Sequence, residues 1–433
     1  MISSKQLIED LTEARNRTLE LVSDLTDEQL MGPQLDIINP LLWEIGHVAW
    51  FHEKWILRHL WNLEPVREDA DHLYDSMAIV HDVRWDLLLP SREGTLNYMQ
   101  EVLDRIIERL DSREPEEDAY FYLLGLFHED MHDEAFTYTR QTLGYPAPSV
   151  STQPAREPSP AGAGGALPGD VEVPGGSYLL GATQDIPFVF DNEKWAHSVE
   201  LKPFQIACRA VSNAEYAAFV EDGGYQRREW WSEEGAKWRQ EVQAEHPVCW
   251  KKESPNRWLR KHFQDFVPLE NDLPVIHVNC FEAEAYCRWA GRRLPTEAEW
   301  EMAASTEFES NGTPKQRKRR YPWGDEPPTS SQANLNWQAM GCVSVDAMAE
   351  GDSAVGCRQM IGNVWEWTAS RFLPYPGFVV DPYKEYSEPW FGTRRVLRGG
   401  CWVTRSRLIR NTWRNYYTPD RRDVWAGFRT CAL

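Results

Sequence analysis

Residues 127–134 read Phe-His-Glu-Asp-Met-His-Asp-Glu, within an apolar segment (residues 120–143) that has no proline and only one glycine, Gly125. These properties predict a helix. On a helix, residues four positions apart lie on the same side, so His128 and His132 should project from one face. Two imidazoles in this relation can bind one transition-metal ion, although a pair of core or surface histidines would have the same spacing.

Residues 128–132 also match the His-Glu-x-x-His pattern of zinc metalloproteases, in which the glutamate is the general base. Such enzymes need a third ligand downstream in the same domain, but the next histidine after His132 is His197. A better third ligand is His47, on a Trp-rich helix predicted for residues 40–63. Three imidazoles would cap one side of a metal ion and leave the other positions open, which suits non-haem Fe(II) better than a closed structural zinc site.

Three acidic residues lie close in sequence to these histidines. We expect Glu44, Glu129 and Asp133 to orient the imidazoles by accepting hydrogen bonds from them. His52, five residues after His47, should point to a different side of its helix and have a structural role.

Residues 1–145 predict a helical domain. Ser3 with Gln6 and Thr26 with Gln29 have the spacing of helix N-caps. Apolar residues at helical spacing predict one helix after the Ser3 cap and another at about residues 91–110. In the first, these residues are Leu7, Leu11, Ala14, Leu21 and Val22. Together with the helices of His47 and His128 they indicate a four-helix bundle, whose interior commonly holds metal ligands from facing helices.

A change of composition separates this domain from the rest of the chain. Residues 146–168 are rich in proline and glycine and predict a linker, which places a second domain at residues 169–433. There, short strands are predicted for residues 177–180, 275–278 and 395–397, and only two helices, one from Ser212 and one at residues 281–290. This pattern is typical of an α+β domain with much irregular loop. The basic run Lys-Gln-Arg-Lys-Arg-Arg (315–320) predicts a solvated loop.

Composition limits the function classes. The 433 residues carry a net charge of -21, which argues against a nucleic-acid or anionic-membrane partner. The N-terminal residues show no signal peptide, and no apolar run approaches the length of a membrane span, so we expect a cytoplasmic protein. The eight cysteines form no CxxC pair and are expected to be reduced thiols. The sequence does not indicate an oligomeric state.

The ordered motifs of the chain carry a family resemblance. Residues 40–47 (Pro-Leu-Leu-Trp-Glu-Ile-Gly-His) and 128–132 resemble the DinB-like iron-binding domain of ergothioneine sulfoxide synthases. The second half resembles the formylglycine-generating-enzyme (sulfatase-modifying factor) domain, whose fold also serves as a lectin-like binding module. Its motifs stand here as Val-Pro-Gly-Gly (173–176), Gly-Arg-Arg-Leu-Pro-Thr-Glu-Ala-Glu-Trp-Glu (291–301), Tyr-Pro-Trp-Gly-Asp (321–325), Gly-Asn-Val-Trp-Glu-Trp (362–367), Arg-Gly-Gly (398–400) and Gly-Phe-Arg (427–429).

This resemblance implies an O2-dependent Fe(II) enzyme that joins a sulfur or selenium donor to the imidazole carbon of hercynine (trimethylated histidine). It implies that His47, His128 and His132 bind the iron. Tyr375 fits the family's phenol that supplies a proton or an electron near the metal, although a packing tyrosine would look the same in sequence. The resemblance also implies substrate-binding residues: Arg84 as a carboxylate clamp, Asn415 for hercynine and Arg421 for the donor. Tyr416 and Tyr417, in the same stretch as Asn415, complete the predicted substrate-binding set.

Two departures from the family pattern bear on the donor. Tyr417 stands where enzymes that use γ-glutamylcysteine have an aspartate, and Met131 stands where they have a glutamine that contacts hercynine. Together with residues 190–197 these positions look most like the selenoneine synthase branch, whose donor is a selenosugar. The loss of the aspartate also agrees with cysteine as donor, so an ergothioneine-type enzyme stays open.

The formylglycine-generating branch itself is disfavoured. It needs a pair of copper-binding cysteines after the Arg-Gly-Gly motif, but here Cys401 is followed by no cysteine up to Arg410. Cys401 is therefore expected to be a small buried residue. A non-catalytic binding module is a further alternative, against which the intact histidine set argues.

Overall fold

The computed structural model describes residues 2–115, 118–151, 167, 169–255 and 257–433, and the chain divides into two compact units at Ser151 and Thr152. This division lies inside the segment predicted as a linker, most of which (152–166 and 168) lies outside the described residues. None of the helices among the described residues is long and apolar enough to cross a membrane.

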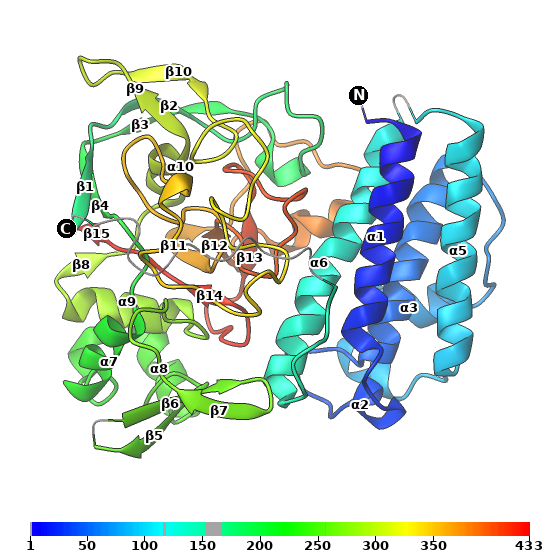
Figure 1. Ribbon diagram of the computed structural model, residues 1–433, viewed down its shortest axis with the longest axis horizontal. Helices are drawn as coiled ribbons and strands as arrows, with labels where there is room; N and C mark the ends of the chain where they lie inside the picture. The colour runs from blue at the N-terminus through cyan, green and yellow to red at the C-terminus, as the bar shows by residue number, and fades with distance from the viewer. Residues whose placement is uncertain (1, 116–117, 152–166, 168, 256) are drawn as a thin grey trace. The chain divides into compact units, whose positions relative to one another are not determined.

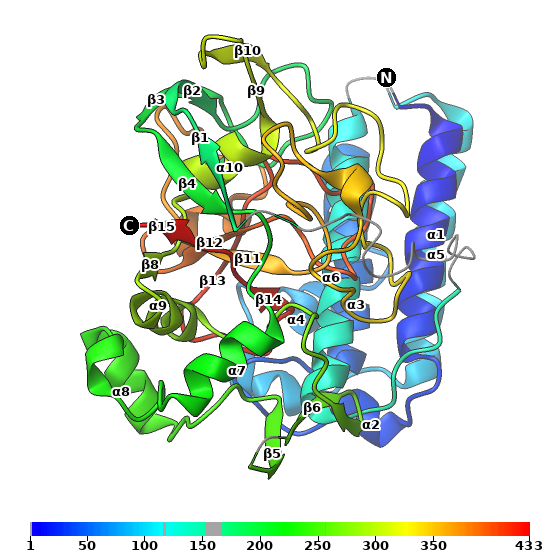
Figure 2. The same ribbon diagram turned by 60° about the vertical axis from the view of Figure 1, so that its left-hand side comes forward.

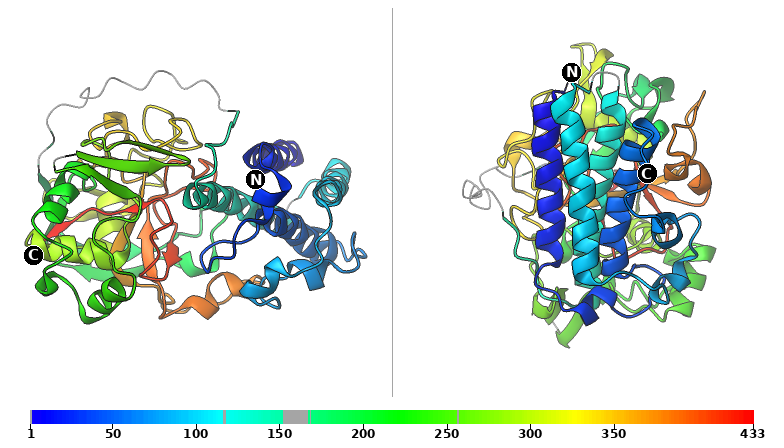
Figure 3. Two further views of the ribbon diagram at one scale, coloured as in Figure 1. Left: turned by 90° about the horizontal axis from the view of Figure 1, so that it is seen from below. Right: turned by 90° about the vertical axis from the view of Figure 1, so that its right-hand side faces the viewer.

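The first unit is built on four long helices, α1 (Ser4–Val22), α3 (Leu41–His52), α5 (Arg92–Ser112) and α6 (Ala119–Leu143). In the right-hand view of Figure 3 they run side by side, with α1 and α3 each packed against both α5 and α6. The short helices α2 (Asp27–Met31) and α4 (Ala70–Tyr74), a 3-10 turn (His81–Trp85) and a π-helical turn (Glu53–Leu60) connect them. The predicted four-helix bundle is confirmed.

Local sequence signals explain where these helices begin and end. The Ser3 side chain accepts a hydrogen bond from the Gln6 amide, and Thr26 forms a reciprocal capping box with Gln29, both as predicted. The helix of His47 changes from α to π geometry after His52 and ends at Leu60, short of the predicted residue 63. Helix α6 ends at Gly144, whose left-handed conformation is typical of a helix C-terminus.

In its described residues, the second unit is an α+β fold with five small sheets connected by irregular segments (Figures 1 and 2). One sheet has the order β1-β4-β15-β8, and another has the order β13-β12-β11-β14. Figure 2 shows β1, β4 and β15 lying side by side. These strands are β1 (Asp170–Val173), β4 (Phe204–Ala207), β8 (Arg292–Arg293), β11 (Trp365–Arg371), β12 (Arg395–Arg398), β13 (Asn415–Tyr417), β14 (Ala426–Gly427) and β15 (Cys431–Ala432).

Three smaller antiparallel sheets complete the strand content. They are the hairpins β2–β3 and β9–β10 and the three-stranded sheet β5-β6-β7. Their bounds are β2 (Gly176–Leu180), β3 (His197–Leu201), β5 (Trp250–Ser254), β6 (Arg257–His262), β7 (Asp265–Pro268), β9 (Thr306–Phe308) and β10 (Pro314–Lys318). All eight cysteines are free thiols, and Cys401 is buried as expected.

Several predictions for this unit need correction. Residues 275–278 do not form a strand, because His277 has a positive φ that interrupts extended backbone. The described residues contain four α-helices rather than two: α7 (Asn213–Glu221) and α9 (Cys280–Trp289) were predicted, and α8 (Glu233–Glu241) and α10 (Glu297–Ser305) were missed. The basic run at residues 315–320 is largely strand β10, and the side chain of Lys318 is buried.

Candidate functional site: a three-histidine cluster

Three imidazoles meet inside the helical unit. His128 and His132 project from successive turns of α6, as their spacing predicts, and His47 faces them from α3. Their ring centroids are 4.5 Å apart for His128 and His132, and 5.1 and 5.0 Å from His47 to His128 and His132. One ring nitrogen from each lies within 4.8 Å of the others, which brings together the predicted ligand set.

In His47 and His132, a hydrogen bond to one ring nitrogen leaves the other nitrogen to bind a metal. His47 Nδ1 lies 2.8 Å from the backbone carbonyl oxygen of Tyr74, and His132 Nδ1 lies 2.6 Å from Glu44 Oε1. A carbonyl and a carboxylate both accept hydrogen bonds, so each Nδ1 carries the proton and each Nε2 keeps its lone pair. The prediction that Glu44 orients an imidazole is confirmed.

Burial keeps His47 and His128 in the neutral form that can bind a metal ion. Removal from water lowers the pKa of His47 and of His128 well below the ordinary histidine value, and the neighbouring His132 lowers both further. Both rings are therefore neutral at physiological pH. A neutral imidazole has the free lone pair that a metal ligand needs.

Aromatic rings hold the imidazole planes. Trp43 and Trp50 stack on the two sides of His47, with ring centroids 4.9 and 5.4 Å away. Phe51 stacks face to face on His128 at 3.6 Å with an interplanar angle of 3°. These apolar walls restrict ring rotation and shield His47 and His128 from water, whereas His132 is partly exposed.

Another face of α6 carries a separate buried network, and there the predicted role of Glu129 proves wrong. Glu129 Oε1 accepts hydrogen bonds from Arg15 Nε (2.8 Å) and Thr18 Oγ1 (2.8 Å), and Glu129 is fully buried. It neither orients a clustered imidazole nor is available as a protease base, because it projects from another face of α6 than His128 and His132. Thr18 Oγ1 also lies 2.8 Å from Asp133 Oδ1, so the two carboxylates share its single hydroxyl hydrogen.

His52 belongs to this second network, in agreement with its predicted structural role. Its Nε2 lies 3.5 Å from Glu129 Oε2, and the residue is fully buried. Burial opposes ionisation of Glu129, but the positive charge of Arg15 lowers the pKa of this carboxyl overall. The network therefore fixes α6 by ion pairing, on a different face from that of His128 and His132.

The three imidazoles fit a first-row transition metal. Within the described part of the chain, these three residues form the one group of histidine, cysteine and acidic side chains that lie close enough together to hold an ion. The group contains no cysteine thiolate. Neutral imidazoles suit Fe, Zn, Co, Ni or Cu, and ligands from one side leave the other coordination positions for substrates. The cluster can thus hold a reactive metal centre rather than a closed structural one.

Arg84 lies in the same unit, in the 3-10 turn after α4. Its guanidinium donates to Asn39 Oδ1 and to the carbonyl of Ser76 (3.1 Å), and it stacks over Trp43 with its central carbon 4.1 Å from the ring centroid. Burial lowers the pKa of this guanidinium. Arg84 is thereby joined to the ring that stacks on His47.

The other predicted substrate residues lie in the second unit, on and after the edge strand β13. Asn415 pairs with Leu397 of β12, and its Oδ1 accepts from the Tyr416 amide (2.8 Å). The Tyr416 ring stacks on Phe372 at 4.0 Å. Arg421 forms a double hydrogen bond with Asp423, with both N–O distances 2.6 Å, and stands 5.1 Å from the Tyr417 ring centroid.

Tyr375 is buried in the core of the second unit. Its hydroxyl donates to Glu297 Oε1 (3.1 Å), and the Arg414 guanidinium lies 4.1 Å from its ring centroid. Burial raises the pKa of this phenol well above its ordinary value, so it keeps its proton at neutral pH.

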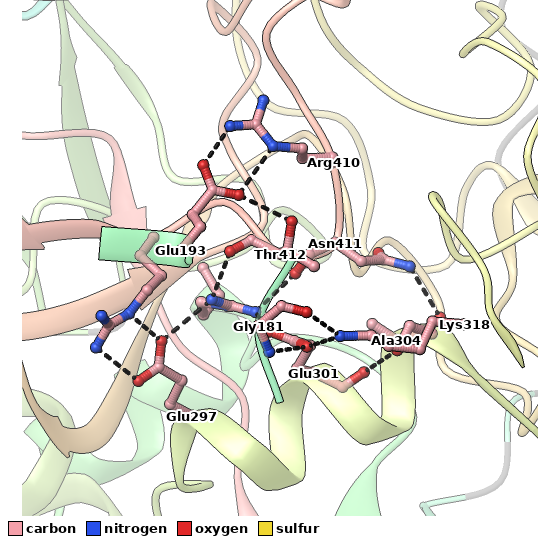
Figure 4. Close-up of polar contacts among 12 residues, drawn as sticks. Gly181, Glu193, Glu297, Glu301, Ala304, Lys318, Arg410, Asn411 and Thr412 are labelled. Atoms are coloured by element: carbon pink, nitrogen blue, oxygen red, sulfur yellow. Dashed lines mark hydrogen bonds and ion pairs between the residues drawn. The ribbon is translucent and has the colours of Figure 1, made fainter. Parts of the chain in front are cut away.

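Sequence reasoning missed the buried ion-pair network around Tyr375. Glu297 and Glu301, one turn apart on α10, both bind Arg398, and Glu297 also binds Arg414 Nε (2.6 Å). Figure 4 shows these two carboxylates, together with the separate pair of Glu193 and Arg410. The capping residues Thr296 and Glu299, at the spacing Ser/Thr-x-x-Glu, could have revealed α10 and with it this network.

Comparison with known proteins agrees with this architecture. The model of the sulfatase-modifying factor enzyme 1-like domain matches residues 154–432, and that of the DinB superfamily matches residues 10–135. The chain is 38% identical to a hercynine oxygenase of Mycolicibacterium thermoresistibile, over 98% of this chain and 94% of the relative. It is also 38% identical to one of Mycobacterium tuberculosis, over 99% of both chains.

A more distant relative matches about two thirds of the chain. A formylglycine-generating enzyme of Streptomyces coelicolor is 32% identical over 66% of this chain and 95% of its own length. The matches to both family models and to relatives along nearly the whole chain thus agree with each other. The chain is an oxidoreductase and belongs to the hercynine oxygenase family, with a DinB-type helical unit followed by a sulfatase-modifying-factor-type unit.

Proposed function

We propose that this chain is an O2-dependent non-haem Fe(II) enzyme that forms a carbon–selenium or carbon–sulfur bond at the imidazole carbon of hercynine. The observation that carries the proposal is the cluster of His47, His128 and His132, whose ligand atoms lie within 4.8 Å of one another. The name of the relatives, hercynine oxygenase, supplies the substrate.

The overall reaction balances with O2 alone. Joining the ring carbon to the donor removes one hydrogen from the carbon and one from the thiol or selenol. Those two electrons, together with two more from oxidation of the bonded chalcogen, reduce O2, so that one oxygen atom ends on the chalcogen and the other in water. Iron held by the three imidazoles would supply open binding positions and the electron transfer between the substrates and O2.

The chain's own residues orient and shield this centre. Glu44 and the Tyr74 carbonyl hold two imidazoles with Nε2 directed away from their Nδ1 partners. The rings of Trp43, Trp50 and Phe51 exclude water that would compete for the open positions. In this proposal Arg84 releases its backbone carbonyl partner and binds a substrate carboxylate instead. Asn415 and Tyr416 contact hercynine.

For the donor we propose a selenosugar. Arg421 is already neutralised by Asp423, and Tyr417 offers an aromatic face rather than a carboxylate. A hexose has no α-carboxylate or α-ammonium and needs neither charge, whereas γ-glutamylcysteine needs both matched. Cysteine as donor is the competing candidate, because it too lacks the γ-glutamyl group.

Tyr375 is proposed to deliver a proton during the reaction. The phenol stays protonated at neutral pH, and its hydrogen bond to Glu297 connects it to a buried chain of charges. Tyr375→Phe should lower turnover while leaving binding of hercynine unchanged, since the ring packing survives. Equal turnover of both proteins would assign Tyr375 to packing alone.

The test is reconstitution of the protein with Fe(II) under anaerobic conditions, followed by hercynine, O2 and one donor at a time. The donors are a selenosugar, cysteine and γ-glutamylcysteine, and products are identified by mass spectrometry. We expect an adduct of hercynine that depends on Fe(II) and O2 and forms fastest with the selenosugar. A faster reaction with cysteine or γ-glutamylcysteine would replace the proposed donor, and no adduct with any donor would refute the reaction class.

A further inference from the structure

The basic run at residues 315–320 is not used by the proposed reaction, and it lines a cavity in the second unit. This cavity has a volume of about 460 Å³ and is lined by residues of β10, of the loop after β2 and of the segment before β13. We call it the basic cavity. Its lining residues are Thr183, Asp185, Ile186, Pro187, Gln316, Arg317, Lys318, Arg319, Arg320, Asp325, Arg410 and Thr412.

The wall of this cavity has more basic than acidic residues. Five lining residues are Lys or Arg and two are Asp, whereas the complete chain has a net charge of -21. Carboxylate partners balance four of the five cations, so the positive charge that a ligand can meet depends on the fifth, Arg320.

Two cations at the cavity are neutralised by buried glutamates and are thereby fixed in place. Lys318 Nζ binds Glu301 and the carbonyl of Gly181 (2.6 Å), and Arg410 Nε binds Glu193 (2.9 Å). The Thr412 hydroxyl also donates to Glu193 (2.8 Å). Figure 4 shows both groups, with Lys318 directed at Glu301 and Arg410 at Glu193. A rigid wall of this kind costs a ligand little ordering entropy.

Arg320 differs from the other cations. Arg317 is paired with Asp325 and Arg319 with Glu307. By contrast, none of the hydrogen bonds or ion pairs among the described residues engages the Arg320 guanidinium, whose Nε is buried, and its central carbon lies 5.4 Å from the ring centroid of Tyr321. A buried guanidinium nitrogen without an acceptor is destabilising, and an anion would satisfy it.

We propose that the basic cavity binds a phosphorylated small molecule, with its phosphate on Arg320 and its hydroxyl groups on Asp185. The planar guanidinium matches phosphate oxygens in a double hydrogen bond. The Asp185 carboxylate is an acceptor for sugar-type hydroxyls. The volume exceeds that of a single phosphate and lies in the range of small-molecule sites.

Isothermal titration calorimetry of the full chain tests this proposal with inorganic phosphate, glucose 6-phosphate, adenosine 5′-monophosphate and uncharged glucose. We expect saturable binding of the organic phosphates, weaker binding of inorganic phosphate and none of glucose. Arg320→Gln should raise the dissociation constants of the phosphate-containing probes about tenfold. Asp185→Asn should weaken glucose 6-phosphate more than inorganic phosphate.

The matched control is Arg257→Gln, which makes the same charge change on strand β6, outside the cavity lining, where Arg257 pairs with Glu253. An equal loss in Arg257→Gln and Arg320→Gln would show non-specific attraction and overturn the proposal. Absence of saturable binding of every phosphate probe up to about 10 mM would overturn it as well. The inference is independent of the hercynine reaction, because Arg320→Gln should leave formation of the hercynine adduct unchanged.

Discussion

The two units hold their functional residues by opposite means. In the helical unit, imidazoles project from regular helices and are oriented by one carboxylate, one carbonyl and aromatic stacking. In the second unit, Tyr375 lies in an irregular segment, and buried Arg–Glu pairs connect helix α10 to strand β12 (Arg398 with Glu297) and to the segment before β13 (Arg414 with Glu297).

This difference has a physical cause. A helix fixes the direction of each side chain through its backbone hydrogen bonds, so that three histidines from two helices can meet at one point. A loop has no such repeat, and long side chains must instead connect segments that are far apart in sequence, as Arg414 connects Glu297 with the Asn192 carbonyl. Loss of a histidine ligand should therefore lower the metal affinity of the helical site. Loss of a charge partner should lower the stability of the second unit.

The largest expected effect is on metal binding by the helical site. His47→Ala, His128→Ala or His132→Ala should lower metal affinity by more than about 100-fold, beyond the effect of removing a partner that only orients a ligand. Helical content should persist, because neutral side chains are lost from a bundle held by other contacts. Metal content after gel filtration and circular dichroism measure the two properties.

The exposed His72 in the same unit provides the control. His72→Ala should bind as much metal as the unchanged protein. Full metal binding by any of the three cluster variants would show that the cluster is not the metal site.

The second unit should respond mainly in stability. Glu301→Gln leaves Arg398 and Lys318 with one fewer charge partner in a fully buried position, which should lower the free energy of unfolding by about 3–5 kcal/mol. Urea unfolding gives this value. The control Glu307→Gln removes a carboxylate that is 37% exposed and should change stability little. A similar loss in both variants would contradict the role assigned to the buried network.

A smaller effect is expected for the residue that orients His132. Glu44→Gln keeps the size of the side chain but weakens its hydrogen bond to Nδ1, so metal affinity should fall by about 10- to 100-fold. Competition with a chromophoric chelator measures it. Glu64→Gln, at an exposed position of the same unit, should have no effect. Unchanged affinity in Glu44→Gln would mean that the hydrogen bond to His132 does not contribute to metal binding.

A still smaller effect is expected from acidification, which should lower the local stability of the second unit around Glu301. Burial opposes ionisation of Glu301, but Lys318 and Arg398 lower the pKa of its carboxyl to about 2, from an ordinary value of 4.5. Because the folded-state pKa lies below the unfolded one, the stabilisation is complete above pH 4.5 and is lost as the pH falls towards 2. Hydrogen exchange at α10, corrected for its intrinsic pH dependence, should show protection falling between pH 5 and pH 3, and constant protection there would contradict this assignment.

The sequence predicted the helical unit and its site better than the second unit. Helical periodicity placed His47, His128 and His132 on two helices, and the capping residues Ser3 and Thr26 marked two helix starts. The partners of Glu129 could not be predicted, because Arg15 and Thr18 come from a helix more than a hundred positions away.

In the second unit, individual residues overrode the local pattern. His277 adopts a positive φ where an apolar run predicts a strand, and Lys318 is buried in a run whose charges predict a solvated loop. Both outcomes depend on distant contacts, since the acceptors of Lys318 are Gly181 and Glu301. Such contacts have no periodicity that a sequence reveals.

The most direct test of the central account uses hercynine that carries deuterium on the imidazole carbon between the two ring nitrogens. The protein is loaded with Fe(II), mixed with this hercynine and a selenosugar, and exposed to O2, and the product is analysed by mass spectrometry. The account predicts an adduct with the isotope pattern of selenium that has lost the deuterium, and no adduct from His128→Ala. An adduct that retains the deuterium, or equal product from the variant, would contradict bond formation at that carbon by the three-histidine site.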